Sequence, residues 1–239
     1  MTATGQVVDA LAPTGVLRAV VNLGNPVLAQ GTRQDPTGVT DDLARELSRR
    51  LGVEGVLECV DAARHSFAAV ADGRADVGFL AVEPERAAQV AFTAPYVLIE
   101  GVFAVPEGSP VRAADDVDRP GVRVGVKQGS AYDLYLTRTL QHAEVVRGAD
   151  GTVAYEEHGL EVVAGIRQPL TRYVAEHPGL RVVEPRFTEI RQAVATSRDR
   201  DPVAVAWLRD AVAELTADGF VAEALARSGQ DATVPAPEG

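Results

Sequence analysis

The stretch VGFLAVEPERAAQVAFTAPY, residues 77–96, decides how this chain is interpreted. It opens with an apolar run of β-branched and aromatic residues, which is typical of a buried strand. Pro84 suits the first turn of a helix, and the glutamates on either side of it suit the positive end of that helix. Arg86 therefore lies just beyond the carboxyl end of a strand, where open α/β sheets bind their ligands. A guanidinium at that place predicts a carboxylate clamp; the alternative is a surface arginine in a first helical turn.

Strand and helix patterns alternate along the rest of the chain. Residues 16–23 read as a strand, and residues 41–51 as a helix with Thr40 as its candidate N-cap and Gly52 as its end. The alternation predicts an α/β fold with mixed, mostly parallel sheets flanked by helices. A Pro/Gly cluster at 106–110 is the best candidate for a domain boundary, because the strand, glycine turn and helix pattern starts afresh beyond it at 121–140.

Composition excludes several classes of function. The net charge of -11 argues against a nucleic-acid partner, because phosphate binding needs basic patches. Cys59 is the only cysteine, and the four histidines are dispersed without ligand spacing, so we expect no metal and no cofactor. No apolar run approaches the ~20 residues of a membrane span, and we expect no membrane insertion.

The order of motifs resembles the family 3 extracellular solute-binding proteins, the amino-acid-type substrate-binding components of ABC transporters. The similarity extends from about Val16 to Gly229 and is most specific in two blocks together, PERAAQVAFTAPY and VGVKQGS. Further matching stretches are GVLRA at 15–19, TGV at 37–39 with DDLARELSRRLG at 41–52, the residues GRADVGFLAVE before the first block, PGVR at 120–123, and Gly219-Phe220.

The resemblance implies a two-lobed type II periplasmic-binding-protein fold with the ligand in a cleft between the lobes. Lobe 1 would comprise residues 1–104 with 194–239 returning to it, and lobe 2 residues 105–193. The mechanism expected is hinge closure, in which contacts made only in the closed form pull the lobes together.

The resemblance also assigns site residues. Arg86 matches the arginine that binds the ligand α-carboxylate. Ser130, after Gln128, matches the small hydroxyl residue at a helix start that receives the same carboxylate; a plain N-cap is the alternative, and one residue can be both. Asn22 and Asn25 match a region of ligand contacts, and turn-forming asparagines are equally consistent with the sequence.

Four positions depart from the family pattern. Phe79 and Ala81 stand where hydroxyl residues are usual, so part of the hydrogen bonding to ligand is missing. Arg167 and Gln168 stand where the family often places an aspartate that neutralises a ligand ammonium, and a cation there would repel an ammonium. The sequence therefore predicts a ligand other than an ordinary α-amino acid, such as a dicarboxylate or keto acid. The alternative for Arg167 is a solvated residue at a helix start.

The main functional hypothesis is a non-enzymatic, monomeric protein that binds a small anionic or amino-acid-like solute and delivers it to an ABC transporter permease. Without a visible signal peptide the chain is expected in the cytoplasm, as a sensor or scavenging relative, or in the periplasm or outside the cell if a signal was removed. The alternative is a cleft enzyme of the cyclohexadienyl or arogenate dehydratase type, which would need a buried carboxylate; Glu100 is the candidate, although a structural acid is the plainer interpretation.

Overall fold

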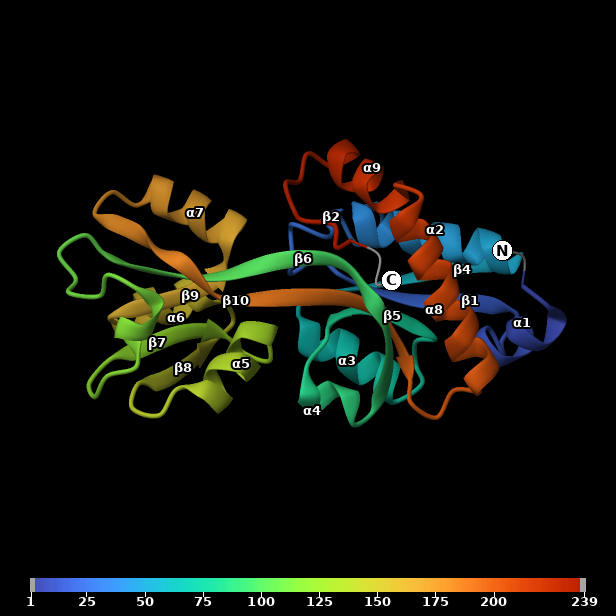
Figure 1. Ribbon diagram of the computed structural model, residues 1–239, viewed down its shortest axis with the longest axis horizontal. Helices are drawn as coiled ribbons and strands as arrows, with labels where there is room; N and C mark the ends of the chain where they lie inside the picture. Colours follow the sequence, from blue (N-terminus) through green and yellow to red (C-terminus); the bar gives the residue numbers. More distant parts are fainter. Residues whose placement is uncertain (1–2, 237–239) are drawn as a thin grey trace. The chain divides into compact units, whose positions relative to one another are not determined.

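The computed structural model describes residues 3–236 of the chain and shows a mixed α/β architecture (Figure 1). Contacts divide it into two compact units: unit 1 comprises the residues up to Leu98 and those from Arg191 onward, and unit 2 comprises Ile99–Ile190. The predicted α/β fold class is confirmed. The predicted lobe bounds at 104/105 and 193/194 stay a prediction, and their outermost residues, 1–2 and 237–239, lie outside the described residues.

Unit 1 is built on a sheet with strand order β4-β1-β5-β10. Strand β1 pairs in parallel with β4 and with β5, while β10 runs antiparallel to β5. The strands are β1 (Val16–Asn22), β4 (Glu54–Val60), β5 (Val77–Ala81) and the long β10 (Leu180–Ser197), with a small hairpin of β2 (Gln30–Gly31) and β3 (Pro36–Thr37). The helices are α1 (Gly5–Leu11), α2 (Val39–Leu51), α3 (Ala63–Ala71), α4 (Pro84–Ala87), α8 (Pro202–Ala217) and α9 (Phe220–Arg227).

Unit 2 has the strand order β6-β9-β7-β8. Strand β7 pairs in parallel with β8 and β9, and β6 runs antiparallel to β9. The elements are β6 (Val90–Pro106), η1 (Ala114–Val117), β7 (Arg123–Lys127), α5 (Ala131–Thr139), β8 (Glu144–Gly148), α6 (Gly151–His158), β9 (Val162–Ile166) and α7 (Arg167–Glu176). Strands β6 and β10, the two long strands of Figure 1, each continue from one unit into the other.

The five residues of β5 are all buried, as the apolar run predicts. Leu80 belongs to a core cluster with Val20 of β1 and Val70 of α3. Burial of such side chains stabilises the fold by roughly 1.5–3 kcal/mol each. Pro84 then opens the four-residue helix α4, as its fixed φ favours, so the packed strand determines where Arg86 is placed.

The start of α2 corrects one prediction. The helix begins at Val39 with Gly38 as its N-cap, and Gly38 has a φ of 104°, which glycine tolerates. Thr40 lies inside the first turn, where its hydroxyl donates to the Leu28 carbonyl at 3.1 Å. A tertiary hydrogen bond therefore uses the side chain that the sequence offered as a cap. The predicted end at Gly52 is confirmed.

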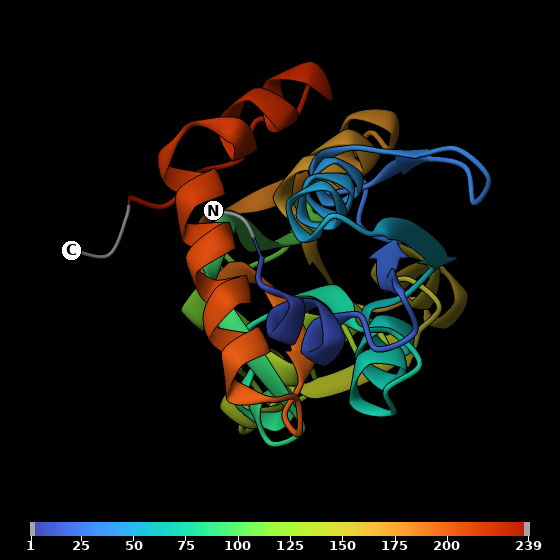
Figure 2. The ribbon, with the colours of Figure 1, turned by 90° about the vertical axis from the view of Figure 1, so that its right-hand side faces the viewer.

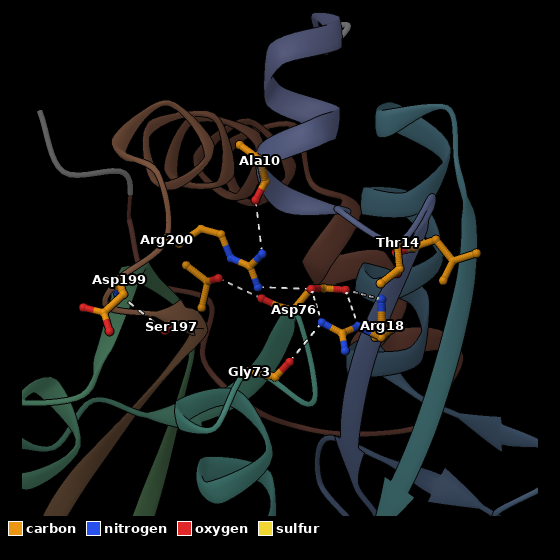
Figure 3. A network of polar contacts seen from close by, with 10 residues as sticks. Ala10, Thr14, Arg18, Gly73, Asp76, Ser197, Asp199 and Arg200 are labelled. Atoms are coloured by element: carbon orange, nitrogen blue, oxygen red, sulfur yellow. Dashed lines mark hydrogen bonds and ion pairs between the residues drawn. The ribbon is translucent and has the colours of Figure 1, made fainter.

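A buried carboxylate connects segments of unit 1 that lie far apart in the sequence. Asp76, fully buried before β5, accepts from the Arg18 backbone and side chain at 2.7–2.9 Å and from Arg200 at 3.1 Å (Figure 3). Arg200 also donates to the Ala10 carbonyl at the end of α1, and Figure 2 shows α1 lying against α8. The returning C-terminal segment is thereby fastened to the N-terminal one.

In unit 2, helix α6 packs unusually close to the sheet. A Cβ atom on Gly151 would lie 2.5 Å from the Ala164 carbonyl oxygen, and one on Gly125 would lie 2.7 Å from the Gly151 oxygen. Two glycines thus allow backbone to meet backbone at the first turn of α6, close to the carboxyl ends of β7 and β9.

Candidate functional site

Arg86 lies on α4, directly beyond the carboxyl end of β5. Its side chain is buried, with the residue only 3% exposed, and Nη1 donates to the Ala81 carbonyl at 3.1 Å. Burial lowers the pKa of the guanidinium to about 10, although Glu83 and Glu85 act in the opposite direction. A cation held at this place favours an incoming anion, because an opposite charge stabilises its charged form.

Strand β5, which precedes Arg86, presents apolar side chains. Phe79 is 4% exposed and meets the ring of Tyr96 edge to face, with the centroids 6.2 Å apart. Burial raises the pKa of the Tyr96 hydroxyl far above its usual range. Ala81 is buried and pairs with Gln192 of β10. These buried side chains belong to the strand that leads to Arg86 and to the ring packed against it.

Asn22, the last residue of β1, and Asn25 stabilise the turn that follows this strand. The Asn22 Oδ1 atom accepts from the Gly24 amide at 3.0 Å, and the Asn25 Oδ1 atom accepts from the Val27 amide at 3.3 Å. Both contacts are short-range turns of the Asx type. Since β1 and β5 are parallel neighbours, Asn22 and the end of β5 lie at the same carboxyl edge of the unit 1 sheet.

Ser130 caps α5 at the carboxyl end of β7. Its Oγ atom accepts from the Asp133 amide at 3.1 Å, while the Asp133 carboxylate accepts from the Gly129 amide at 2.8 Å. Arg147 of β8 donates to Asp133 at 3.1 Å and compensates its charge. Gln128 is exposed, and its backbone amide donates to the Gly148 carbonyl at 3.0 Å. The loop is held in place by Arg147 and Gly148 of β8 and by Asp133 of α5. The sequence alone did not identify Asp133 and Arg147 as supports.

Arg167 is the first residue of α7, beyond the carboxyl end of β9. Its guanidinium forms ion pairs with Glu100 of β6 and with Glu184 of β10, and Arg186 donates to Glu100 at 2.8 Å. Gln168 is half-buried beside it. The sequence showed no carboxylate near Arg167 because both glutamates are distant along the chain. Its role in ligand binding stays a prediction.

Glu100 carries a proton less readily than a free glutamate. Burial raises its pKa, but hydrogen bonds and charge from Arg167 and Arg186 outweigh burial and leave the pKa below its usual value. The carboxylate is therefore ionised at neutral pH. An acid poised to donate a proton would instead need a raised pKa.

Parallel strands bring two of the predicted site residues to one edge of unit 2. Val124 of β7 pairs with Val162 of β9, and Gly125 with Val163. Strand β7 ends at Lys127 and β9 ends at Ile166, directly before Arg167. The cap at Ser130 and the guanidinium of Arg167 thus belong to the same carboxyl edge, where ligands bind in sheets of this kind.

Within residues 3–236, no group of three or more histidine, cysteine, aspartate or glutamate side chains has the arrangement to hold a metal ion. Across the same residues, no helix has the length and apolar character to cross a membrane.

Together these observations describe a two-unit α/β protein whose candidate binding residues lie at the carboxyl edges of its sheets. The sequence model of the bacterial extracellular solute-binding proteins, family 3, matches residues 18–230. The chain belongs to this family, and the resemblance drawn from its motifs is confirmed.

Curated and solved relatives agree with this assignment. The L-cystine-binding protein TcyJ of Escherichia coli K12 is 26% identical over 241 residues, covering 90% of this chain and 86% of TcyJ. A mutant of ArgBP from T. maritima matches with a TM-score of 0.74 at 22% identity, covering 93% of this chain and 99% of that one. A putative ABC transporter binding component from Wolinella succinogenes, complexed with lysine, matches with a TM-score of 0.73 at 20% identity, covering 89% and 95%. The two structures show the shared fold.

Proposed function

We propose that this chain binds a small carboxylate-bearing solute, with Arg86 as the principal carboxylate contact. The observation that carries the proposal is the position of Arg86: a guanidinium 3% exposed at the carboxyl edge of a buried parallel strand, with a pKa lowered by burial. A ligand carboxylate would form a charge-assisted, bidentate hydrogen-bond pair with the guanidinium and offset its lost hydration.

Ser130 is the proposed second contact for the same carboxylate. Its hydroxyl and the first amides of α5 supply donors and the positive end of a helix dipole. Arg86 belongs to unit 1 and Ser130 to unit 2, so one ligand bound by both would favour a closed form by hinge motion. Strands β6 and β10, which run through both units, are the natural hinge.

The proposed biological role is that of a substrate-binding component for an ABC transporter. Membership in an extracellular solute-binding family supports this role, and so do relatives named for cystine binding or solved with lysine. Delivery to a permease would require the protein to work outside the cytoplasm. Cell fractionation tests that part: recovery only in the cytosol would instead favour a sensor or scavenging relative.

The ligand class that we propose is an organic anion or an acidic, amino-acid-like solute. Arg167 occupies the position where the resemblance predicts an aspartate for the ligand ammonium. The dry surroundings of Phe79 and Ala81 provide few hydroxyl partners for a polar ligand. Both features favour carboxylate over ammonium recognition.

A thermal-shift screen of amino acids, keto acids and dicarboxylates, followed by calorimetry, tests the proposal. We expect at least one carboxylate to raise the melting temperature of the wild type. Arg86→Met should abolish that rise, whereas Arg74→Met, which removes an exposed arginine of the same unit, should leave it intact. Ligand binding that is equal in Arg86→Met and wild type would contradict the role of Arg86.

A further inference from the structure

The ion-pair cluster around Arg167 is unequal on its two sides. On one side Glu100, 33% exposed, is held by both Arg167 and Arg186. On the other side Glu184, 62% exposed, meets both terminal nitrogens of Arg167, with Nη2 and Oε2 2.8 Å apart. The Glu184 carboxylate thus lies across the fork of the guanidinium in the two-pronged geometry that arginine uses for carboxylates.

The Glu184 contact is the more exposed of the two. An exposed ion pair contributes little to stability, because solvent screens its attraction and both side chains lose freedom when they are ordered. Within residues 3–236, Glu184 has one ion-pair partner, Arg167, whereas Glu100 has two. An incoming carboxylate would therefore displace Glu184 and leave Glu100 in place.

The exchange keeps Arg167 paired with two carboxylates. The side chains of Arg167 and Arg186 carry two positive charges, and Glu100, Glu184 and Glu189 carry three negative ones. A ligand carboxylate that takes the place of the Glu184 carboxylate on Arg167 restores the pair that is broken. The replaced glutamate then becomes free to hydrate, as an exposed side chain readily does.

The position of Arg167 connects this exchange to ligand binding. Strands β7 and β9 are parallel neighbours, so the Ser130 cap that follows β7 and Arg167, which follows β9, lie at the same carboxyl edge of the unit 2 sheet. A ligand held at that cap by one carboxylate would have its remaining part close to the first residue of α7. Arg167 is the cation that such a part would meet on this edge.

We propose that Arg167 is a second carboxylate site, occupied in the ligand-free protein by Glu184, and that the preferred ligand is a dicarboxylate whose second carboxylate displaces Glu184. Glu184 acts as a built-in competitor that sets the affinity and rejects ligands with a neutral second end. The inference rests on the proposed function, since it assigns the ligand class of that same site.

Calorimetry on the full chain tests the proposal with matched probes. The probes are succinate, glutarate and adipate, each compared with its monoamide, which has the same size but one charge less. We expect at least one diacid to bind the wild type at least tenfold more tightly than its monoamide. Glu184→Gln should increase the affinity for that diacid about 2- to 5-fold, the range that loss of an exposed ion pair predicts. The affinity for the monoamide should stay unchanged.

Two further variants complete the test. Arg167→Gln should reduce the binding of the diacid to the level of its monoamide. Glu189→Gln removes a neighbouring exposed glutamate that contacts Arg186 but not Arg167, and it should change neither affinity. Circular dichroism and melting temperature confirm that each variant folds.

The outcomes separate this inference from the proposed function. If carboxylates bind and require Arg86, but monoamides bind as tightly as diacids or Glu184→Gln fails to tighten any diacid, the second carboxylate site is refuted while the proposed function stands. If no carboxylate binds wild type or Glu184→Gln, both proposals fail.

Discussion

Replacing Arg86 by methionine should stabilise the ligand-free protein. Burial lowers the pKa of this guanidinium from 12.5 to about 10. Each factor of ten in acid strength corresponds to about 1.4 kcal/mol, so the fold holds the charged side chain about 3 kcal/mol less favourably than water does. Methionine keeps the length of the side chain and fills irregular space without a charge.

Part of this stabilisation is lost because the substitution also removes the hydrogen bond that Arg86 donates to the Ala81 carbonyl. Leaving the Ala81 carbonyl without its donor costs about 1 kcal/mol. The net expectation is a stabilisation of about 2 kcal/mol, which in a protein of this size raises the melting temperature by about 4–8 °C. The cation would therefore be kept at the expense of stability, as expected for a binding residue.

Calorimetric or fluorescence melting of wild type, Arg86→Met and the exposed control Arg74→Met at neutral pH measures this difference. The control should stay within about 0.5 kcal/mol of wild type. Because the unfolded chain keeps the Arg86 proton more strongly than the fold does, the wild type recovers stability between about pH 10 and 12.5, and the gap to Arg86→Met narrows there. An Arg86→Met protein that melts several degrees below wild type would refute the reasoning.

Three further predictions concern stability. Asp76→Asn should destabilise the protein by about 3 kcal/mol. This value is at the low end for breaking a buried ion pair because one partner arginine, Arg18, is 31% exposed. Chemical denaturation measures the loss, and the exposed Asp199→Asn is a control that should change the stability by nearly zero. Hydrogen bonds from two arginines lower the pKa of Glu46 to about 2, so its carboxylate stabilises the fold above pH 4.5 and loses that contribution as pH falls through 2. Glu46→Gln should therefore cost about 1 kcal/mol of stability at pH 7. A stability difference between variant and wild type that persists unchanged at pH 2 would contradict this. Gly151→Ala should cost about 1–3 kcal/mol, because its methyl group meets the Ala164 carbonyl; an unchanged denaturation midpoint would show that α6 can move away without cost.

Local sequence signals predicted most of the elements near the proposed site. The apolar run of β5 is buried throughout, and Pro84 opens α4 where its fixed φ favours a helix start. The break between α8 and α9 falls at Asp218-Gly219, where Gly219 adopts a φ of 91° that glycine tolerates. These features depend on neighbours in the chain, which a single sequence displays.

Long-range partners could not be predicted in the same way. Arg167 pairs with Glu100 and Glu184, which approach it from two other strands. The residues next to Arg167 in the sequence therefore give no sign of its carboxylate partners. Asp76 likewise joins Arg18 and Arg200 across most of the chain. Strand pairing creates these contacts, and sequence spacing carries no signal for them.

The extent of β6 shows the same limit. The sequence indicates a strand over 97–105, whereas the structure extends it from Val90 to Pro106, through Pro95. Proline weakens a strand prediction because it lacks an amide donor. In the fold, the Thr93 hydroxyl accepts from the Val194 amide at 3.1 Å, a side-chain contact that helps to hold this part of β6 beside β10.

The most direct test of the central claim is native mass spectrometry of the protein purified gently from its own cells, with the released small molecule identified. The account predicts a bound solute that carries at least one carboxylate, retained by wild type and by Arg74→Met but absent from Arg86→Met. A bound solute without a carboxylate, or one that Arg86→Met retains as fully as wild type, would contradict it.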